Sequence, residues 1–358
     1  MWNQNKGLRR SMLAAALAAL PVLATGSTAG GGQPNVPTPQ MLRAQKSVQL
    51  AVAMAGSRLV SVGERGIVLL SDDGGQHWRQ ARVPAVGSLT ALSFATPKKG
   101  WAVGHGGIVL TTDDGGESWS KVFDGAAAAA TELASATAAA DPRRLQDAQR
   151  LVQEGADKPF LSVHFLDEKR GMVAGAYGLL FATDDGGRNW TSLMGRIDNA
   201  GGRHLYAVQV VGGQILLAGE QGSLFRAAGW NADFKPLATP YKGTYFGVLA
   251  PREGELLAYG LRGNAYRSVD QGANWEQVSL PQVSLSAGMV TADGGVVLAN
   301  EAGQLFLSKD HGKSFSEVPV VNAFPFTGLA EAADRRIILS GIRGVSLQSL
   351  MPSGEGRP

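Results

Sequence analysis

A Gly-x-x-Gly motif recurs along the chain at a nearly constant spacing, and this repeat constrains the fold more than any other feature. Its seven copies begin at Gly63, Gly104, Gly175, Gly219, Gly260, Asn300 and Gly341, with Asn in place of the first Gly in the sixth. The last glycines of successive copies are 41, 71, 44, 41, 40 and 41 residues apart, so one unit carries an insertion. A period of this length is typical of propellers and solenoids.

Each unit contains four short runs of strand length that are separated by turn residues. In the second unit these runs cover 92–95, 101–103, 108–112 and 119–123. Four strands per unit indicate a propeller blade, because each blade buries its faces against its neighbours. The sequence therefore predicts an all-β fold, a seven-bladed β-propeller of four-stranded blades that forms one domain over 41–350.

A second motif, Ser/Thr-x-Asp-x-Gly-x-x-Trp/Phe, follows most of the Gly-x-x-Gly strands. Its five full copies contain Asp73 and Trp78, Asp114 and Trp119, Asp185 and Trp190, Asp270 and Trp275, and Asp310 and Phe315. Asp and hydroxyl side chains can bond the backbone of their own turn, Gly supplies a positive φ, and an aromatic ring can fill the space between blades. We expect a structural role for these residues and no catalytic one.

This second motif resembles the Asp box, or bacterial neuraminidase repeat. Together with the Gly-x-x-Gly strands, as in Gly100-Trp101-Ala102-Val103-Gly104 and Asp113-Asp114-Gly115-Gly116, it resembles the photosystem II stability and assembly factor family over roughly 50–350. The resemblance implies an exported, non-enzymatic propeller that acts as an assembly factor or scaffold for a membrane protein complex. In a host without photosynthesis, it implies a partner in the cell envelope or beside a transporter.

The first 26 residues have the organisation of a secretory signal peptide. Lys6, Arg9 and Arg10 precede an apolar run over 12–24 and small residues near the end, and Pro21 interrupts the run. Arg9-Arg10 leaves twin-arginine export open beside the general route. We expect a linker over 27–40, a flexible tail over 351–358, and a monomer without a transmembrane segment in the periplasm or outside the cell, or in the thylakoid lumen of a photosynthetic host.

Composition excludes several classes of protein and site. The formal net charge is +3, but without the three basic residues of the leader the chain holds 30 basic and 30 acidic residues, so a nucleic-acid partner is not supported. There is no Cys, and the five His residues show no metal-binding spacing. No Gly-x-x-Gly copy opens a helix as a phosphate loop does. We predict no metal and no cofactor.

The insertion and the last blade depart from a plain ring. Asp141, Pro142 and Gly155 mark the start and end of a helix, so we predict a helical hairpin over about 125–157 between blades 2 and 3. Such an insertion is either a partner-binding arm or a neutral surface addition. The last blade lacks an Asp motif and a fourth strand, and we predict that 34–46 supply this strand beside 344–350.

The middle residues of the Gly-x-x-Gly turns converge at the mouth of the channel and form the candidate site. They include Arg65, Arg262, Arg343, Glu64, His105, Tyr177, Glu220 and Glu301. The three Arg residues can hold carboxylates of an acidic partner surface through forked hydrogen bonds. The alternative is that these turns are polar only because they are solvated, with the Glu residues balancing the Arg residues.

A sialidase-like or other glycoside hydrolase is the enzyme alternative. Asp boxes and three Arg residues occur in sialidases, and paired carboxylates such as Glu64 and Glu301, or Tyr177 as nucleophile, are the groups that would serve. Against this, the Arg-Ile-Pro motif of sialidases is missing and seven repeats replace their six blades. We therefore favour a non-enzymatic protein that binds a protein partner through these turns.

Overall fold

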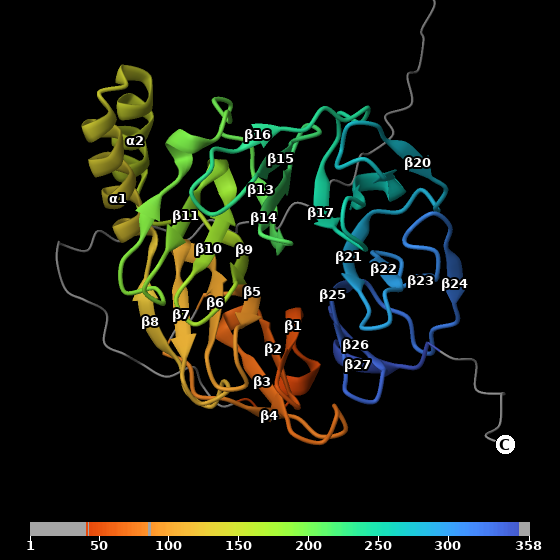
Figure 1. The fold of residues 1–358 in the computed structure, drawn as a ribbon. Helices are drawn as coiled ribbons and strands as arrows, with labels where there is room; N and C mark the ends of the chain where they lie inside the picture. Colours follow the sequence, from red (N-terminus) through yellow and green to blue (C-terminus); the bar gives the residue numbers. More distant parts are fainter. Residues whose placement is uncertain (1–40, 42, 85–86, 351–358) are drawn as a thin grey trace, which may run out of the picture. The chain divides into compact units, whose positions relative to one another are not determined.

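The fold consists of seven small antiparallel sheets, one for each predicted blade (Figure 1). It is known from a computed structural model that describes residues 41, 43–84 and 87–350. The predicted signal peptide (1–26), linker (27–40) and tail (351–358) lie outside these residues. Six sheets have four strands, and the seventh has three within the described part of the chain. The predicted seven-bladed propeller is confirmed.

The strands of each blade follow one another in chain order from the inside of the ring to its outside. Blade 1 consists of β1 (Gln49–Ala55), β2 (Arg58–Gly63), β3 (Val68–Ser71) and β4 (Arg79–Gln80). Blade 2 consists of β5 (Leu89–Phe94), β6 (Gly100–Gly104), β7 (Val109–Thr112) and β8 (Ser120–Phe123). Blade 3 consists of β9 (Phe160–Phe165), β10 (Gly171–Gly175), β11 (Leu180–Thr183) and β12 (Thr191–Ser192).

The remaining blades repeat this pattern. Blade 4 consists of β13 (Leu205–Val211), β14 (Gln214–Gly219), β15 (Leu224–Ala227) and β16 (Lys235–Pro236). Blade 5 consists of β17 (Tyr245–Leu249), β18 (Leu256–Gly260), β19 (Ala265–Ser268) and β20 (Glu276–Val278). Blade 6 consists of β21 (Leu285–Val290), β22 (Val296–Asn300), β23 (Leu305–Ser308) and β24 (Ser316–Val318). Blade 7 consists of β25 (Phe326–Glu331), β26 (Ile337–Gly341) and β27 (Gly344–Gln348).

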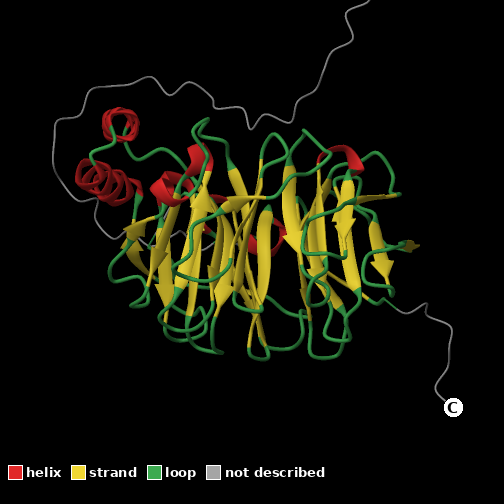
Figure 2. Cartoon of the chain, turned by 45° about the horizontal axis from the view of Figure 1, so that its top comes forward, coloured by secondary structure: helices red, strands yellow, loops and turns green. Residues whose placement is uncertain are grey.

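The first strands of the blades line the centre and close the ring. β1 contacts β5, and the contacts continue through β9, β13, β17 and β21 to β25, which contacts β1 in turn. Because neighbouring strands are antiparallel, the Gly-x-x-Gly turns and the connections between blades share one face, which we call the turn face. The turns that carry the Asp motif, called here the Asp turns, lie on the opposite face, and the strands run between the two (Figure 2).

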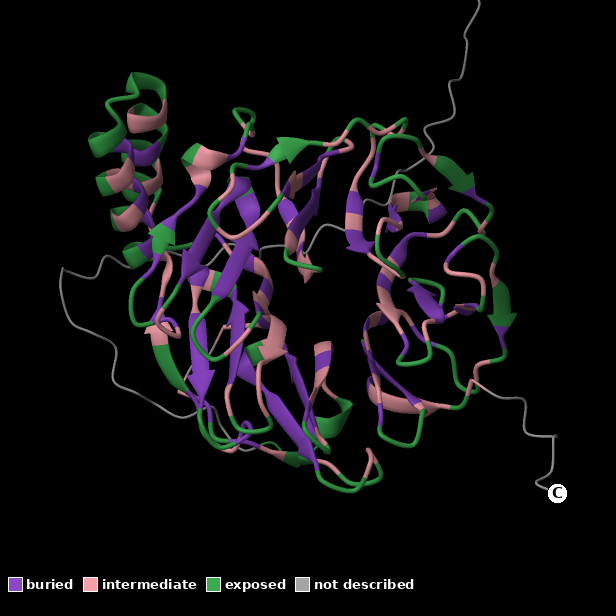
Figure 3. Cartoon of the chain, in the orientation of Figure 1, coloured by how far each residue is buried: buried purple, intermediate pink, exposed green. Residues whose placement is uncertain are grey.

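The core lies between neighbouring blades rather than at the centre of the molecule. The second strand of each blade is buried almost throughout, whereas the fourth strands are mostly exposed (Figure 3). Trp101 in β6 is fully buried and stacks on Phe165 of blade 3 with ring centroids 3.4 Å apart. Its indole N–H donates to the Gly186 carbonyl at 3.1 Å, so one side chain joins two blades by packing and by a hydrogen bond.

The five Asp turns share one pattern of hydrogen bonds. In blade 2, the Thr112 hydroxyl donates to the Asp114 carboxylate at 2.7 Å and accepts from the Gly116 N–H at 2.9 Å. The Ser118 N–H also donates to Asp114, at 3.0 Å. The turn is therefore closed by its own side chains, which satisfy backbone groups that no strand partner reaches.

The glycine and the aromatic residue of each Asp turn contact the preceding blade. Gly116 has a φ of +92°, and a Cβ there would lie 3.1 Å from the Leu70 side chain of blade 1. Trp119, 6% exposed, packs into the core cluster that blades 1 and 2 share. The motif thus fixes the distance between neighbouring blades as well as the shape of the turn.

The predicted helical hairpin is confirmed between blades 2 and 3. Helix α1 (Gly125–Ala139) begins after Asp124, and α2 (Pro142–Glu154) begins after Asp141; each Asp side chain accepts a backbone N–H of the first turn. These bonds supply partners for N–H groups that lack one inside the helix. The hairpin belongs to the turn face and α1 contacts β12, the outer strand of blade 3.

The predicted closing strand is wrong for the part that the structure describes. Ala44–Lys46 form a short 3-10 helix, η1, that lies between β4 and β27 and does not pair as a strand. Ala44 is 7% exposed and packs among Ile67, Leu69 and Val345. The short helix thus contacts both blade 1 and blade 7 before the chain enters β1. Residues 34–40 and 42 lie outside the described residues, so their pairing stays a prediction.

Candidate binding face

The turn face carries all eight residues that the sequence singled out. Four of its turns are short 3-10 segments, η2 (Glu64–Gly66), η3 (His105–Gly107), η4 (Ala176–Gly178) and η6 (Leu261–Gly263). The predicted residues are Glu64 and Arg65 in blade 1, His105 in blade 2, Tyr177 in blade 3, Glu220 in blade 4, Arg262 in blade 5, Glu301 in blade 6 and Arg343 in blade 7. They share a face but, among the described contacts, no two of the eight bond each other directly.

Long side chains occupy positions of these turns that favour Gly or Asn. Arg65, Tyr177, Gln221 and Arg262 have φ between 55° and 58°, and each is followed by a Gly with positive φ. Two successive residues in this region define the type I′ turn, whose usual sequence is Asn-Gly. A non-Gly residue there costs on the order of 1 kcal/mol. Gln271, His311 and Arg335 have positive φ on the opposite face, so this backbone conformation is not confined to the turn face.

Arg343 differs from the other two predicted Arg residues. Its turn joins β26 to β27 with Gly341 paired to Gly344, and the positive φ falls on Gly344 instead of on the Arg. Arg65, Arg262 and Arg343 are exposed, and none forms an ion pair with another residue that the structure describes. These three guanidinium groups are therefore available to an external carboxylate.

Two of the predicted Glu residues have local structural partners. Glu64 accepts from the Val48 N–H at 3.3 Å, and Glu220 accepts from the His204 N–H at 2.8 Å. Each carboxylate therefore ties its turn to the residue just before the first strand of the same blade. The alternative in which these Glu residues balance the Arg residues has no ion pair to support it in the described part of the chain.

An aromatic row crosses the turn face from blade 3 to blade 5. The Tyr177 and His204 rings meet edge to face with centroids 5.0 Å apart, and Tyr206 meets Phe246 in the same way at 5.3 Å. His204 and Tyr206 lie 6.3 Å apart and connect the two pairs. Tyr206 and Phe246 follow the first residues of innermost strands, so the row borders the centre of the ring. Burial is the main cause that raises the Tyr206 pKa.

Sequence analysis overlooked Lys158, which supports this row. Its ammonium lies 5.5 Å from the centre of the Tyr177 ring and pairs with Glu154 and Asp157 at 2.8 and 2.6 Å. The sequence signal for Lys158 was its position as a basic residue at the end of the insertion, just before Pro159 and β9. Tyr206 and Phe246, aromatic residues at equivalent places in β13 and β17, were likewise visible in the sequence.

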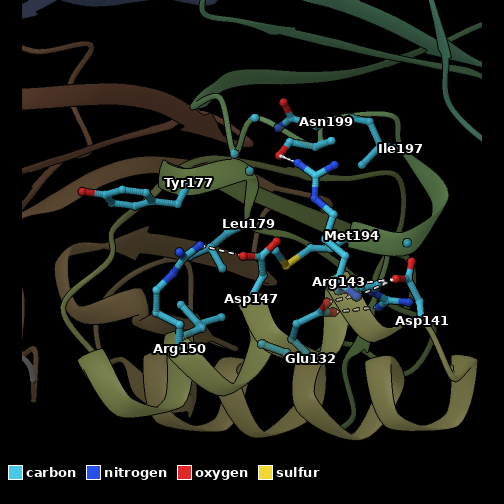
Figure 4. A pocket seen from close by; sticks show the side chains of 18 of the residues that line it. Glu132, Asp141, Arg143, Asp147, Arg150, Tyr177, Leu179, Met194, Ile197 and Asn199 are labelled. Atoms are coloured by element: carbon cyan, nitrogen blue, oxygen red, sulfur yellow. Dashed lines mark hydrogen bonds and ion pairs between the residues drawn. The ribbon is translucent and has the colours of Figure 1, made fainter.

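A groove separates α2 from the outer loops of blade 3. Its volume is about 540 Å³, and Figure 4 shows the helix on one side and the loop after β12 on the other. We call it the hairpin groove; its floor includes Leu151, Leu179 and Met194, and its walls include Arg143, Asp147 and Asn199. Tyr177 lies at one end of it (Figure 4), so the groove and the aromatic row share a residue.

The described residues contain neither a metal-ligand cluster nor a helix able to span a membrane. No group of three or more His, Asp or Glu side chains there is placed to hold a metal ion. In the same part of the chain, no helix combines the length and the apolar character needed to cross a membrane.

The fold and its turns define a class, the propellers with Asp turns. Within this class, 43–128, which hold blades 1 and 2, match the family model described as Photosynthesis system II assembly factor YCF48. The resemblance that the motifs predicted is confirmed in that segment. None of the curated proteins matches the chain.

Solved structures share the fold over most of the chain. YCF48 bound to a D1 peptide is 18% identical with a TM-score of 0.63, covering 88% of this chain and 96% of its own. YCF48 from Cyanidioschyzon merolae is 16% identical with a TM-score of 0.62, covering 87% and 97%. The WD40 β-propeller domain of Doa1 is 12% identical with a TM-score of 0.64, covering 85% and 93%. At these identities the likeness shows the fold alone.

Proposed function

We propose that this chain is a non-enzymatic, exported propeller that binds a segment of a partner protein on its turn face. It acts as an assembly factor or scaffold for a membrane protein complex, and the partner contributes carboxylates to Arg65, Arg262 and Arg343. In a photosynthetic host the compartment is the thylakoid lumen; elsewhere it is the periplasm or the cell exterior. The three exposed Arg residues without described ion pairs are the observation that carries this proposal.

Three further observations support it. The family match over 43–128 is to an assembly factor, and one structure with this fold holds a peptide. The strained positions of Arg65 and Arg262 place exposed guanidinium groups on the same face. Guanidinium groups bind carboxylates through paired hydrogen bonds, which suits an acidic segment or a chain terminus.

The glycoside hydrolase alternative has less support. Glu64 and Glu301 belong to blades 1 and 6, which blade 7 separates, and Glu64 accepts a backbone hydrogen bond. Hydrolysis by paired carboxylates needs two carboxyl groups that flank one glycosidic bond. Purified protein is expected to leave aryl glycosides and sialosides intact. The proposal would be reversed if the protein hydrolysed such a glycoside and a substitution of Glu64, Tyr177 or Glu301 abolished this activity.

Site-directed crosslinking tests the location of the partner. Because the chain has no Cys, a single introduced Cys can carry a benzophenone at a chosen place. I342C presents it on the turn face, at an exposed residue beside Arg343, and K313C presents it on an exposed position of an Asp turn. We expect the first variant to crosslink a subunit of a membrane complex in extracts of the source organism. Equal crosslinking from both faces would contradict the proposal.

A further inference from the structure

The hairpin groove has fixed walls. The buried Glu132 carboxylate in α1 accepts two hydrogen bonds at 2.8 Å from Arg144 in α2 and one from the Ser192 hydroxyl in β12. At the other side, Arg143 donates to the Ala200 carbonyl at 3.2 Å and joins α2 to the loop beyond β12. The Ser192–Glu132 and Arg143–Ala200 hydrogen bonds join the hairpin to the propeller. The groove therefore exists before any ligand binds.

The charges that line the groove cancel one another. Arg144 pairs with Glu132, Arg150 pairs with Asp147 at 2.7 Å, and Lys158 pairs with Glu154 and Asp157. The lining as a whole contains four basic and five acidic side chains. Arg143 has no ion pair in the described part of the chain, and neither has Asp198, which lines the same groove. Because the lining carries no net positive charge, the groove is a poor site for an anion. In this respect it differs from the three Arg residues of the turn face.

Apolar side chains form the floor. Leu151 and Met194 are partly buried and pack against the core cluster of blades 2 and 3, and Leu179 is 2% exposed. A volume of about 540 Å³ lies in the range of pockets that bind a drug-sized molecule or a few residues of a peptide. An apolar side chain on this floor gains burial, while the polar walls can bond a peptide backbone.

From this geometry we infer that the hairpin groove is a second binding site for the partner, one that takes an uncharged, extended segment with an apolar side chain. The inference rests on the proposed function. Tyr177 belongs both to the groove and to the turn face, so a chain docked on that face can continue into the groove. The helical insertion is then a specificity element, since it adds a site that the propeller alone lacks.

The test fills the groove without touching the turn face. Ala200 is exposed and lines the groove, so A200W fills it and A200F fills it less. V152W, at an exposed position of α2 outside the lining, is the matched control. Random dodecapeptides displayed on phage are first depleted on A200W, which removes ligands of other surfaces, and are then selected on the wild-type protein. Synthetic versions of the selected peptides are then titrated against each variant, after its melting temperature has been shown to match the wild type.

Selected peptides are expected to carry an apolar residue in an uncharged context. A200W should weaken their binding at least tenfold, A200F by a smaller factor, and V152W and the double variant R65E/R343E by less than twofold. The inference is overturned if no peptide is selected, or if the selected peptides bind A200W as well as the wild type. Loss of binding only in R65E/R343E would overturn it too, while leaving the proposed function in place.

Discussion

Glu132 in α1 and Arg144 in α2 form a two-bond ion pair in which the carboxylate is 2% exposed. Removing one partner of a buried pair leaves a charge without compensation and costs about 3 kcal/mol. We expect R144A to release the hairpin from blade 3, seen as faster hydrogen exchange over 125–154. R150A removes only exposed ion pairs and should leave exchange unchanged. Unaltered exchange in R144A would show that the Glu132–Arg144 pair is not needed to hold the hairpin on blade 3.

The Thr112 hydroxyl tests the role of the Asp turns. T112V keeps the shape of the side chain but leaves the buried Gly116 N–H without its partner. We expect a loss of about 1–2 kcal/mol in the free energy of unfolding, measured with urea. T191V, on an exposed strand position, should change it by less than about 0.5 kcal/mol. Equal effects of the two substitutions would refute a structural role for the turn hydroxyl.

Much of the fold follows from the sequence because its determinants are local. The turn glycines and the Ser/Thr-Asp pairs act within a few residues, so their spacing predicts the number of blades. The docking of the hairpin instead depends on Ser192 bonding Glu132, 60 residues away in the chain. No periodic pattern records such a contact, and the hairpin groove was accordingly not predicted. Arg343 shares the spacing of Arg65 but has a different turn, since spacing does not fix φ.

Acid should weaken the fold through the Asp turns. Hydrogen bonds from Asn274, mainly from its backbone N–H and then from its side chain, lower the pKa of Asp270 to about 2. Hydrogen bonds from His77, again mainly from the backbone, lower the pKa of Asp73. An Asp whose pKa is lower in the folded than in the unfolded state stabilises the fold at pH values above its unfolded-state pKa, near 3.8. This stabilisation is lost as the pH falls toward the folded-state pKa.

The urea midpoint should therefore decline between about pH 4 and pH 2. D270N should have a shallower decline, because one of the contributing carboxylates is gone. D198N is the control, as Asp198 is exposed and has no hydrogen bond in the described part of the chain. A pH dependence that D270N leaves intact would mean that other carboxylates govern acid unfolding.

Ala44 tests closure of the ring at its N-terminal side. The side chain is buried between blades 7 and 1, so A44D is expected to lower the free energy of unfolding by about 2 kcal/mol or more. Q45D places the same charge at the exposed neighbour and should have little effect. If both variants unfold at the wild-type urea midpoint, η1 does not contribute to closure. Deleting 34–46 should likewise destabilise more than removing the tail from Pro352.

Charge reversal at Arg65 and Arg343 tests the central claim most directly. Blades 1 and 7 are adjacent, so both Arg residues can meet one acidic surface. The measurement is the dissociation constant for the partner that crosslinking identifies, taken over a range of salt concentrations. K98E/K313E makes the same charge change at exposed positions on the opposite face and serves as the control. We predict at least tenfold weaker binding and a smaller salt dependence for R65E/R343E, with an unchanged urea midpoint. Binding by R65E/R343E that equals the control at every salt concentration would contradict docking on the turn face.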